Sequence, residues 1–410
     1  MSNTPQIRFA GFTDAWEQRK LSEISEKVSK KNQDMVVDEV FTNSAEFGII
    51  SQRDYFDKDI ANSENIDGYY IVEPNDFVYN PRISTLAPFG PVRRNKLDKS
   101  GAMSPLYYVF RTHDVDCGYL EYFFKTNRWH SFMHLNGNSG ARSDRFAIRD
   151  EVFRDMPISM PQDIEEQKKV GDFFSTLELA ITLHQRKCDA LQKFKKSMLQ
   201  KMFPQNGESV PEIRFAGFTD AWEQRKLGDH SEIVAGGTPN TAHSEYWNPK
   251  EIPWMSSGEI NNKVIYSTDN MISKIGFSNS SAKWVKEKSV LIALAGQGKT
   301  RGTVAITEIS LTTNQSIAAI QPDDVLYYKY LFQNLEGRYD ELRNISSGDG
   351  TRGGLNKQIL SDLIVLAPSI SEQKKIGDFL CNIDNLITLH QRKLEKLKQF
   401  KAAMLEKIFV

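Results

Sequence analysis

Two stretches of the chain carry mostly apolar residues at steps of three and four, the spacing of one face of an α-helix. In the first stretch these positions are Val170, Phe173, Leu177, Ile181, His184, Cys188, Leu191, Phe194, Met198 and Met202. In the second they are Ile376, Phe379, Ile383, Ile387, His390, Leu394, Leu397, Phe400, Met404 and Ile408. Each stretch is predicted to form one helix of about 57 Å. So long and narrow a stripe requires a partner helix, and the other stretch is the obvious one.

The two stretches belong to a duplication. The block 166–203 returns at 372–409, and a shorter head block, 5–21, returns at 211–227 with one difference in seventeen positions. Both blocks are displaced by 206 positions. This period far exceeds the roughly 20 to 50 residues of solenoid repeats, so we expect two large halves related by an approximate two-fold axis. Such an axis would run the helices antiparallel and place the intervening parts at opposite ends of a rod.

The intervening parts differ from each other. The first insert, Ser22–Ser159, and the second insert, Gly228–Val365, are equal in length but show no similarity that can be aligned. The segment 204–210, PQNGESV, is the only clear linker. Because the chain ends at the position where its first half enters that linker, we expect its start and end to lie close together.

Composition excludes several classes of protein. Apolar residues make up 40% of the chain and charged residues 26%, as in soluble globular proteins. No apolar run is long enough for a membrane span and the start lacks a signal peptide's apolar core, so a cytoplasmic location is expected. The isolated Cys117, Cys188 and Cys381 predict neither a disulfide framework nor a structural zinc site. A net charge of -1 means that any contact with DNA must be local.

Two motifs carry a resemblance to a known family. The head block has the form P-x-I-R-F-x-G-F, and each helical block opens with E-Q-K-K, at 166–169 and 372–375. Together they resemble the conserved regions of the specificity (S) subunits of type I restriction-modification enzymes. The second insert adds Gly237-Thr238-Pro239, Ile252-Pro253-Trp254, Asn314-Gln315 and Leu355-Asn356. The first insert departs from this pattern, because it has no G-T-P and no I-P-W segment.

The resemblance implies an α+β protein with two mixed α/β target-recognition domains, separated by an antiparallel pair of long coiled-coil-like helices. Each domain would read one half of a bipartite, asymmetric DNA site. The organisation expected is a first recognition domain at 1–159 with its head block at 5–21, a spacer helix at 160–203, a linker at 204–210, a second recognition domain at 211–365 with its head block at 211–227, and a second spacer helix at 366–410.

The partners are also implied by the resemblance. They would be double-stranded DNA, two modification (methyltransferase) subunits and restriction (endonuclease/translocase) subunits, with no membrane. The chain itself would be a non-catalytic subunit without a cofactor. S-adenosylmethionine, ATP and magnesium would belong to the partner subunits.

Competing interpretations are disfavoured by missing motifs. The segment 296–300, GQGKT, resembles a P-loop, but Ala293 stands where that motif needs glycine and the following residues alternate like a strand. Asn80-Pro81-Arg82 is not the N-P-P-[YF] loop that adenine methylation would need. His184 and His390 could meet as metal ligands, although a polar residue that fixes helix register is the preferred interpretation. A coiled-coil scaffold that never touches DNA is the rival from a different class.

Arginine reads guanine and the amide side chains read adenine by paired hydrogen bonds, so these residue types in turn-like stretches are the DNA-binding candidates. The candidates are Asn80, Arg82, Arg93, Arg94, Arg142, Arg145, Gln297, Lys299, Arg301, Asn314, Gln315, Arg352 and Asn356. The lysines and arginines of the two long helices are attributed to a solvated face, with phosphate contact as the alternative. Trp16 and Trp222 are expected to be packed anchors.

The unlike inserts on a repeated scaffold predict that sequence recognition is modular. Replacing Gly228–Val365 with the insert of a relative should change one half-site and leave the other intact. Mapping methylated adenines in a genome that carries the hybrid gene measures this. A change in both half-sites would show that the inserts do not read DNA independently.

Overall fold

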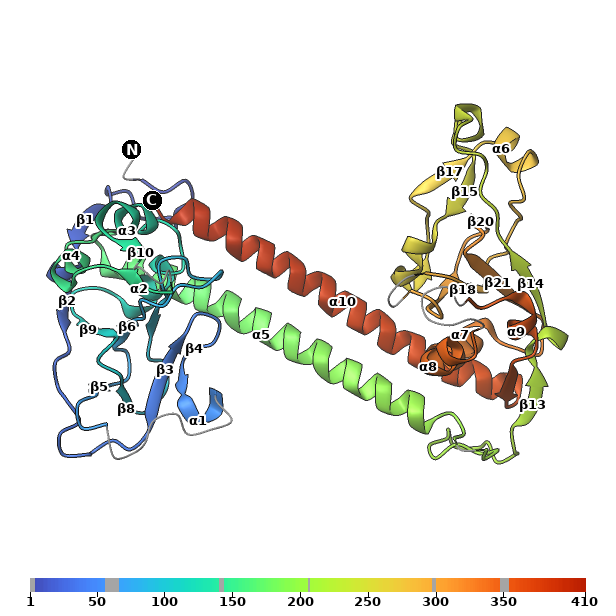
Figure 1. Cartoon of the computed structure of the whole chain (residues 1–410), viewed down its shortest axis with the longest axis horizontal. Coiled ribbons are helices and arrows are strands. Elements are labelled where there is room, and N and C mark those ends of the chain that lie inside the picture. The colour runs from blue at the N-terminus through green and yellow to red at the C-terminus, as the bar shows by residue number, and fades with distance from the viewer. Residues whose placement is uncertain (1–3, 56–65, 140–143, 206, 297–299, 347–353) are drawn as a thin grey trace. The chain divides into compact units, whose positions relative to one another are not determined.

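The computed structural model describes residues 4–55, 66–139, 144–205, 207–296, 300–346 and 354–410. The chain forms two compact units (Figure 1): unit 1 comprises Met1–His184 with Lys393–Val410, and unit 2 comprises Gln185–Arg392. The helices α5 (Ile164–Lys201) and α10 (Ile370–Ile408) each contribute residues to both units. The prediction of two long helices is therefore confirmed, although both begin four residues later than the predicted spacer segments 160–203 and 366–410.

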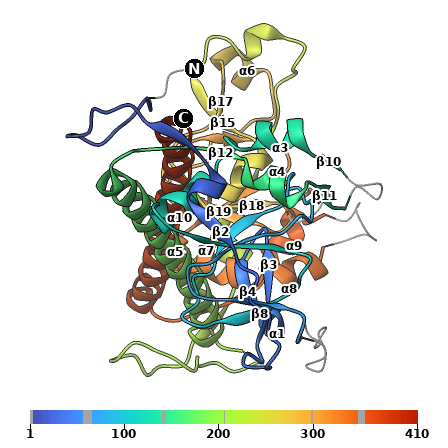
Figure 2. The same cartoon turned by 90° about the vertical axis from the view of Figure 1, so that its left-hand side faces the viewer.

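Unit 1 is built on two four-stranded sheets, with strand orders β2-β9-β6-β7 and β4-β3-β8-β5 (Figure 2). Its strands are β1 (Glu17–Lys20), β2 (Ser25–Lys27), β3 (Val40–Ser44), β4 (Gly48–Ser51), β5 (Tyr70–Val72), β6 (Phe77–Tyr79), β7 (Val92–Arg94), β8 (Gly101–Met103), β9 (Tyr108–Thr112), β10 (Asn138–Ser139), β11 (Phe146–Ala147) and β12 (Pro157–Met160). Its short helices are η1 (Leu21–Glu23), α1 (Gln52–Tyr55), α2 (Cys117–Phe123), α3 (His130–Asn136) and α4 (Asp150–Arg154). An aromatic core that includes Phe77, Phe110 and Phe153 lies between the first sheet and the helices.

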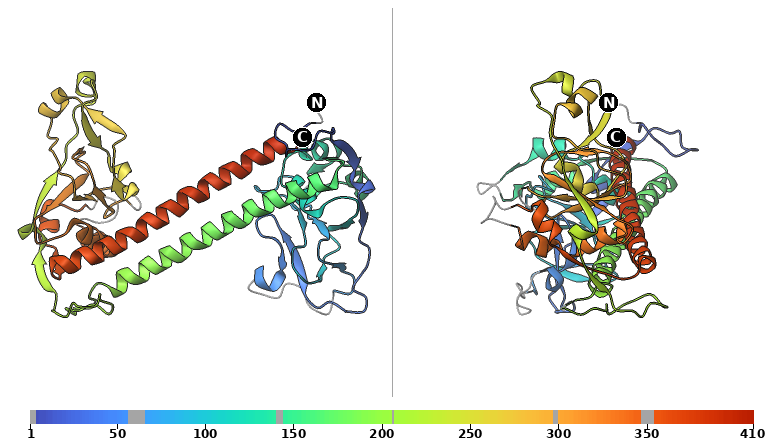
Figure 3. Two further views of the ribbon diagram at one scale, coloured as in Figure 1. Left: turned by 180° about the vertical axis from the view of Figure 1, so that it is seen from behind. Right: turned by 90° about the vertical axis from the view of Figure 1, so that its right-hand side faces the viewer.

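Unit 2 is built on a five-stranded sheet, β14-β21-β18-β19-β16, and a three-stranded sheet, β17-β15-β20 (Figure 3). Its strands are β13 (Glu223–Lys226), β14 (Ser231–Ala235), β15 (Ile252–Met255), β16 (Val264–Ile265), β17 (Asn270–Ile272), β18 (Ser289–Ala293), β19 (Val304–Thr307), β20 (Thr312–Thr313), β21 (Ile317–Pro322) and β22 (Ile364–Ala367). Its short helices are η3 (Leu227–Asp229), η4 (Ser244–Tyr246), η5 (Ser257–Asn262), α6 (Lys274–Ser278), α7 (Tyr328–Gly337), α8 (Tyr339–Asn344) and α9 (Lys357–Ser361). Strands β18 and β19 are buried along their whole length, which fits their apolar sequences.

The two ends of each insert are held side by side by the same short sheet. Strand β1 of the first head block pairs antiparallel with β12, and β13 of the second pairs with β22. Just inside these strands, Leu21 N–H donates to Met156 O at 2.9 Å and Leu227 N–H to Leu363 O at 2.8 Å. Each insert therefore leaves the repeated scaffold and returns to it at the same place. The residues inside an insert can vary without disturbing the blocks that flank it.

The repeated motifs meet in a buried ion pair. Arg8 of the first head block donates twice to Glu166, at 2.7 and 2.8 Å, and Arg214 repeats both bonds to Glu372. Both carboxylates are 1% exposed. Trp16 and Trp222 are 2% and 3% exposed, which confirms the prediction that they are packed anchors.

Each insert contains a short helix that packs closely against a long helix, α2 in the first insert and α7 in the second, although the insert sequences do not align. We call each of them the docking helix of its insert. Tyr119 of α2 donates to Ser159 O at 2.6 Å, and Tyr330 of α7 donates to Leu366 O at 2.5 Å. A Cβ on Gly171 would lie 2.9 Å from Tyr119 N, and one on Gly377 would lie 2.6 Å from Tyr330 N. The single glycine of each long helix is thus explained, because only glycine lets the docking helix approach so closely. Sequence comparison missed this match because the tyrosines are 211 positions apart rather than 206.

Each unit is completed by the end of the long helix from the other repeat. In unit 1, Phe409 joins the core and Phe400 contacts Phe173, with ring centroids 6.2 Å apart. In unit 2 the equivalent Phe203 joins the core and Phe194 contacts Phe379 at 6.4 Å. The start of each long helix therefore lies against the end of the other, so the antiparallel pairing is confirmed within each unit.

The start and end of the chain also meet within unit 1. Gln6 N–H and Ile7 N–H donate to Lys407 O at 2.9 and 3.2 Å. The bond from Ile213 N–H to Lys201 O at 2.8 Å is the counterpart of the second in unit 2. The prediction that the ends of the chain lie close together is confirmed (Figure 1).

A chain that ends at Val210 should form a symmetric dimer. It keeps the first head block, the first insert and α5, but loses the end of α10 that covers the core of unit 1. The end of α5 from a second copy carries the equivalent side chains, Met198, Met202 and Phe203 in place of Met404, Ile408 and Phe409.

Sedimentation velocity measures the mass of this half-chain. The Phe203→Asp half-chain is the matched control, and it should remain monomeric because a carboxylate cannot enter the aromatic core. A folded but monomeric parent half-chain would contradict the proposed exchange of helix ends.

Candidate nucleic-acid interface

The first insert brings two predicted arginines together. Arg82 and Arg145 form an antiparallel backbone bridge, flanked by hydrogen bonds from Ile83 N–H to Asp144 O at 2.9 Å and from Phe146 N–H to Pro81 O at 2.7 Å. Both arginine side chains are exposed. Two guanidinium groups on adjacent extended segments can bind phosphates or the edge of a guanine. This pair is the strongest candidate contact in unit 1.

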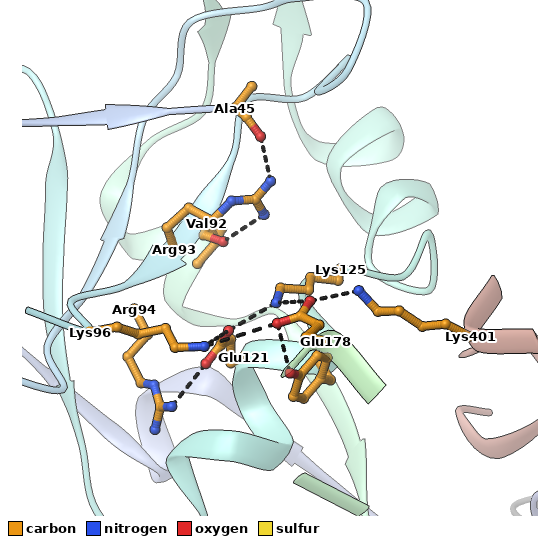
Figure 4. A network of polar contacts seen from close by, with 10 residues as sticks. Ala45, Val92, Arg93, Arg94, Lys96, Glu121, Lys125, Glu178 and Lys401 are labelled. Atoms are coloured by element: carbon orange, nitrogen blue, oxygen red, sulfur yellow. Dashed lines mark hydrogen bonds and ion pairs between the residues drawn. The ribbon is translucent and has the colours of Figure 1, made fainter. Parts of the chain in front are cut away.

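Three other candidates of the first insert, Asn80, Arg93 and Arg94, have partners within the protein. Asn80 is 8% exposed and donates to Asn43 O at 2.8 Å, while its Oδ1 accepts from Arg82 N–H at 3.0 Å. It therefore shapes the turn that presents Arg82. Arg93 donates to Ala45 O at 2.7 Å, and burial lowers its pKa. Arg94 pairs with Glu121 at 2.9 Å (Figure 4). For these three residues, contact with DNA remains a prediction.

A cavity of about 480 Å³ adjoins the arginine pair. Its lining includes Pro81 and Phe146, together with Tyr108, Asn138 and Arg149. Burial raises the pKa of Tyr108 to about 12, so its hydroxyl stays protonated at neutral pH. Asn138 and Arg149 are exposed, and sequence reasoning did not select either of them. The signal was present for Asn138, since it lies in the turn-rich segment NGNSGARSDRF that also contains Arg145.

The second insert brings three motif segments together. Thr238 donates to Gln315 Oε1 at 2.5 Å, and Gly237 N–H donates to Thr313 O at 2.8 Å. Trp254 donates to Gly237 O at 2.9 Å, and Asn314 N–H donates to the neighbouring Met255 O at 3.0 Å. The G-T-P, I-P-W and N-Q segments therefore form one surface. Gln315 is exposed on it and Asn314 is half-buried, so at least one amide head can face a ligand.

A second group of candidates lies around the ends of β18 and β19. Leu355 N–H donates to Leu294 O at 2.9 Å, which places the segment before α9 beside the end of β18. Asn356 is exposed, but its Oδ1 caps α9 by accepting from Ile359 N–H at 2.9 Å. Arg301 precedes β19 and is half-buried. The prediction of a strand after the P-loop-like segment is confirmed, since β19 pairs antiparallel with β18. The P-loop interpretation stays disfavoured because the element that follows is a strand and not a helix.

Four candidates lie outside the described residues: Arg142, Gln297, Lys299 and Arg352. Among the residues that the structure does describe, no group of three or more histidine, cysteine, aspartate or glutamate side chains could hold a metal ion. Within the same residues, no helix combines the length and apolar character that crossing a bilayer demands.

A family model described as the type I restriction modification DNA specificity domain matches the chain twice, at residues 13–193 and 219–399. These two matches are displaced by the same 206 positions as the repeat. The specificity subunit of the type I restriction enzyme MjaIX of Methanocaldococcus jannaschii is 32% identical over 197 residues, which are 46% of this chain and 44% of that protein. The specificity subunit of EcoR124I/EcoR124II of Escherichia coli is 25% identical over 166 residues, 40% and 41% of the two chains. The matched segments thus span less than half the length of these curated relatives.

Solved structures support the fold. The crystal structure of the S subunit of a type I restriction-modification system from M. genitalium matches with a TM-score of 0.64 at 13% identity, covering 99% of both chains. A structure from work on assembly and conformational transition of the type I R-M system matches with a TM-score of 0.50 at 16% identity, covering 96% of this chain and 97% of that one. The predicted fold class, two mixed α/β domains with long paired helices, is confirmed.

If the arginine pair contacts DNA, Arg82→Ala or Arg145→Ala should weaken binding to the recognised sequence by about 1 to 3 kcal/mol. A base contact would show the loss mainly at one base position, whereas a phosphate contact would show it on every sequence. Titration of DNA fragments that differ at single positions measures both.

Arg93→Ala is the contrasting variant. It leaves Ala45 O without its donor, so it should lower the melting temperature, and an unchanged base preference would remove Arg93 from the candidate DNA contacts. Unchanged DNA binding in both Arg82→Ala and Arg145→Ala would exclude the pair from the interface.

Proposed function

Because this chain belongs to the type I restriction modification DNA specificity family, we propose that it is the DNA-reading specificity subunit of a type I restriction-modification complex. Each insert reads one half of a bipartite DNA site. The chain performs no catalysis, and S-adenosylmethionine, ATP and magnesium act on the partner subunits.

The observation that carries this proposal is one scaffold that occurs twice with two unlike inserts. The buried ion pair, the docking helix and the helix ends are repeated in both units, whereas the sheets differ in strand number and order. Repeated parts present their inserts in the same way, and different inserts present different side chains. A protein with two equivalent but different readers recognises two different half-sites, so the DNA site is asymmetric.

The partner subunits are proposed to bind a repeated surface of the long helices. The segment ITLHQRK, 181–187, returns unchanged at 387–393, and Leu183 and Leu389 within it are 55% and 60% exposed. Nearby buried positions are less constant, since Phe174 corresponds to Leu380 and Cys188 to Leu394. Packing normally constrains buried positions more than exposed ones. Exposed residues that are identical in the two repeats therefore support a surface that binds the same kind of subunit at two places. This agrees with two modification subunits.

The proposed function is tested with the chain, its modification subunit and a radiolabelled methyl donor. Methylation should depend on both halves of one asymmetric site, and the chain alone with DNA and methyl donor should transfer no methyl group. The rival, a scaffold that does not bind DNA, predicts no salt-dependent shift of DNA mobility by the complex beyond that of the modification subunit alone. A symmetric recognition site, or methylation without this chain, would contradict the proposal.

The proposed subunit-binding surface around Leu183 and Leu389 gives a separate prediction. Leu183→Glu should release one modification subunit, and Leu389→Glu should release the other, because a buried carboxylate without a partner opposes docking. Native mass spectrometry counts the bound subunits.

The matched control is Leu179→Glu, since Leu179 is 60% exposed on the same helix but corresponds to Asn385 in the repeat. It should leave two subunits bound. Retention of both subunits by Leu183→Glu and by Leu389→Glu would rule out this surface.

A further inference from the structure

In each unit a carboxylate on one long helix meets a lysine on the other. Glu178 of α5 accepts from Lys401 Nζ of α10 at 2.6 Å in unit 1. In unit 2, Asp384 of α10 accepts from Lys195 Nζ of α5 at 2.5 Å. Glu178 corresponds to Asp384 and Lys195 to Lys401 at the 206-residue offset. The duplication therefore presents each insert with the same pair of opposite charges.

The first insert binds the acid of this pair (Figure 4). Lys125, which follows α2, donates to Glu178 at 2.7 Å, and the Tyr122 hydroxyl donates to it at 2.9 Å. Lys125 also pairs with Glu121 at 2.9 Å, and Glu121 pairs with Arg94 at 2.9 Å. Burial opposes ionisation of Glu178, but Lys125 and Lys401 outweigh it and lower its pKa to about 2. Glu178 is therefore fully charged at neutral pH.

The second insert binds both charges. Gln333 of α7 donates to Asp384 at 2.8 Å, and Lys263 donates to it at 3.0 Å. Glu336, at the end of α7, pairs with Lys195 and with Lys263. Lys195 and Asp384 are 6% and 7% exposed, so neither charge can lose its partners without a large cost. These four ionic groups also help to line a cavity of about 1450 Å³.

The two docking helices use matching positions with different chemistry. Tyr122 and Gln333 are 211 positions apart, like Tyr119 and Tyr330, and each donates to the scaffold acid. One turn later, Lys125 corresponds to Glu336, which has the opposite charge. Because each pair places a carboxylate beside a lysine, it can bind a docking helix whose side chain at this position is positively or negatively charged. Unrelated inserts can thus be seated on identical helices.

Each network leads towards candidate DNA contacts in its own insert. In unit 1, Arg94 lies on β7, which pairs with β6, and β6 runs into Asn80 and Arg82. In unit 2, Lys263 immediately precedes β16, which pairs with β19, and β19 follows Arg301. A tilt of the docking helix would therefore shift the strands that carry these residues.

We propose that Glu178 with Lys401, and Asp384 with Lys195, form a charged docking socket in each unit that fixes the orientation of its insert for reading one half-site. Glu178 and Asp384 are positioning residues, because they act through the insert and not by touching DNA. This inference rests on the proposed function, in which each insert reads one half-site.

The test uses Glu178→Gln and Asp384→Asn in the full chain, assembled with the modification subunit. Methylation rates are measured on the intact site and on sites with one base pair changed in either half. Glu178→Gln should reduce discrimination in the first half-site by about tenfold, the effect of one lost charged hydrogen bond, and leave the second unchanged. Asp384→Asn should do the reverse.

Two further variants separate positioning from general stability. Glu178→Asp restores the charge with the side chain that unit 2 already uses, so it should regain much of the discrimination. Glu165→Gln, on the exposed first turn of α5, should match the parent chain. Hydrogen exchange of the amides of 119–125 provides a measurement without DNA, and it should rise in Glu178→Gln but not in Glu165→Gln.

The outcomes distinguish the two proposals. An equal loss of rate on every substrate, with discrimination unchanged, would overturn the socket as a positioning device. Unchanged exchange in Glu178→Gln would overturn it as a docking contact. A parent complex that ignores one half of the site would overturn the proposed function, whatever the exchange experiment gives.

Discussion

The buried carboxylate at the start of each long helix is the constraint on which the rest of each unit depends. Glu166 and Glu372 are almost without solvent, and an unpaired charge in that position would cost several kcal/mol. Arg8 and Arg214 satisfy them with two hydrogen bonds each, so the head block must fold against the helix that follows the insert. This contact closes each insert into a loop whose ends are fixed.

The neighbouring glutamine extends this constraint into the insert. Gln167 Oε1 accepts from Asp116 N–H, and Gln373 Oε1 accepts from Tyr327 N–H, both at 2.9 Å. The E-Q pair of the E-Q-K-K motif therefore joins three parts: the head block, the docking helix and the long helix. The fourth residue has a different role, because Lys169 lies over the Phe12 ring at 4.7 Å and Lys375 repeats this over Phe218 at 4.9 Å. The E-Q-K-K motif is short and says little by itself, but the same contacts in both copies explain why its residues are repeated.

The sequence predicted the repeated half of the molecule well and the inserts poorly. Long helices, their pairing and the tryptophan anchors follow from periodicity and duplication, which are visible without a structure. The match between α2 and α7 was hidden because only two positions carry it: a shared tyrosine, and a side chain three residues later that donates to the scaffold acid. These positions are also 211 residues apart, five more than the offset of the repeat. Site residues were harder still. Arg82 and Arg93 have the same side chain in similar polar stretches, yet one is exposed and the other donates to Ala45 O, and only the paths of β6 and β7 decide between them.

A nearly neutral chain can still read DNA if its cations are divided between two tasks. Arg93, Arg94 and Lys125 are held inside unit 1 by carbonyl and carboxylate oxygens, so they help to hold the insert in place. Arg82 and Arg145 are exposed on adjacent segments, where one guanidinium can serve a phosphate and the other a base edge. Non-specific attraction scales with the number of exposed cations, whereas discrimination between sequences depends on how rigidly a few of them are held. A chain of net charge -1 therefore gains little general affinity for DNA, which fits the proposed function, in which it acts together with partner subunits.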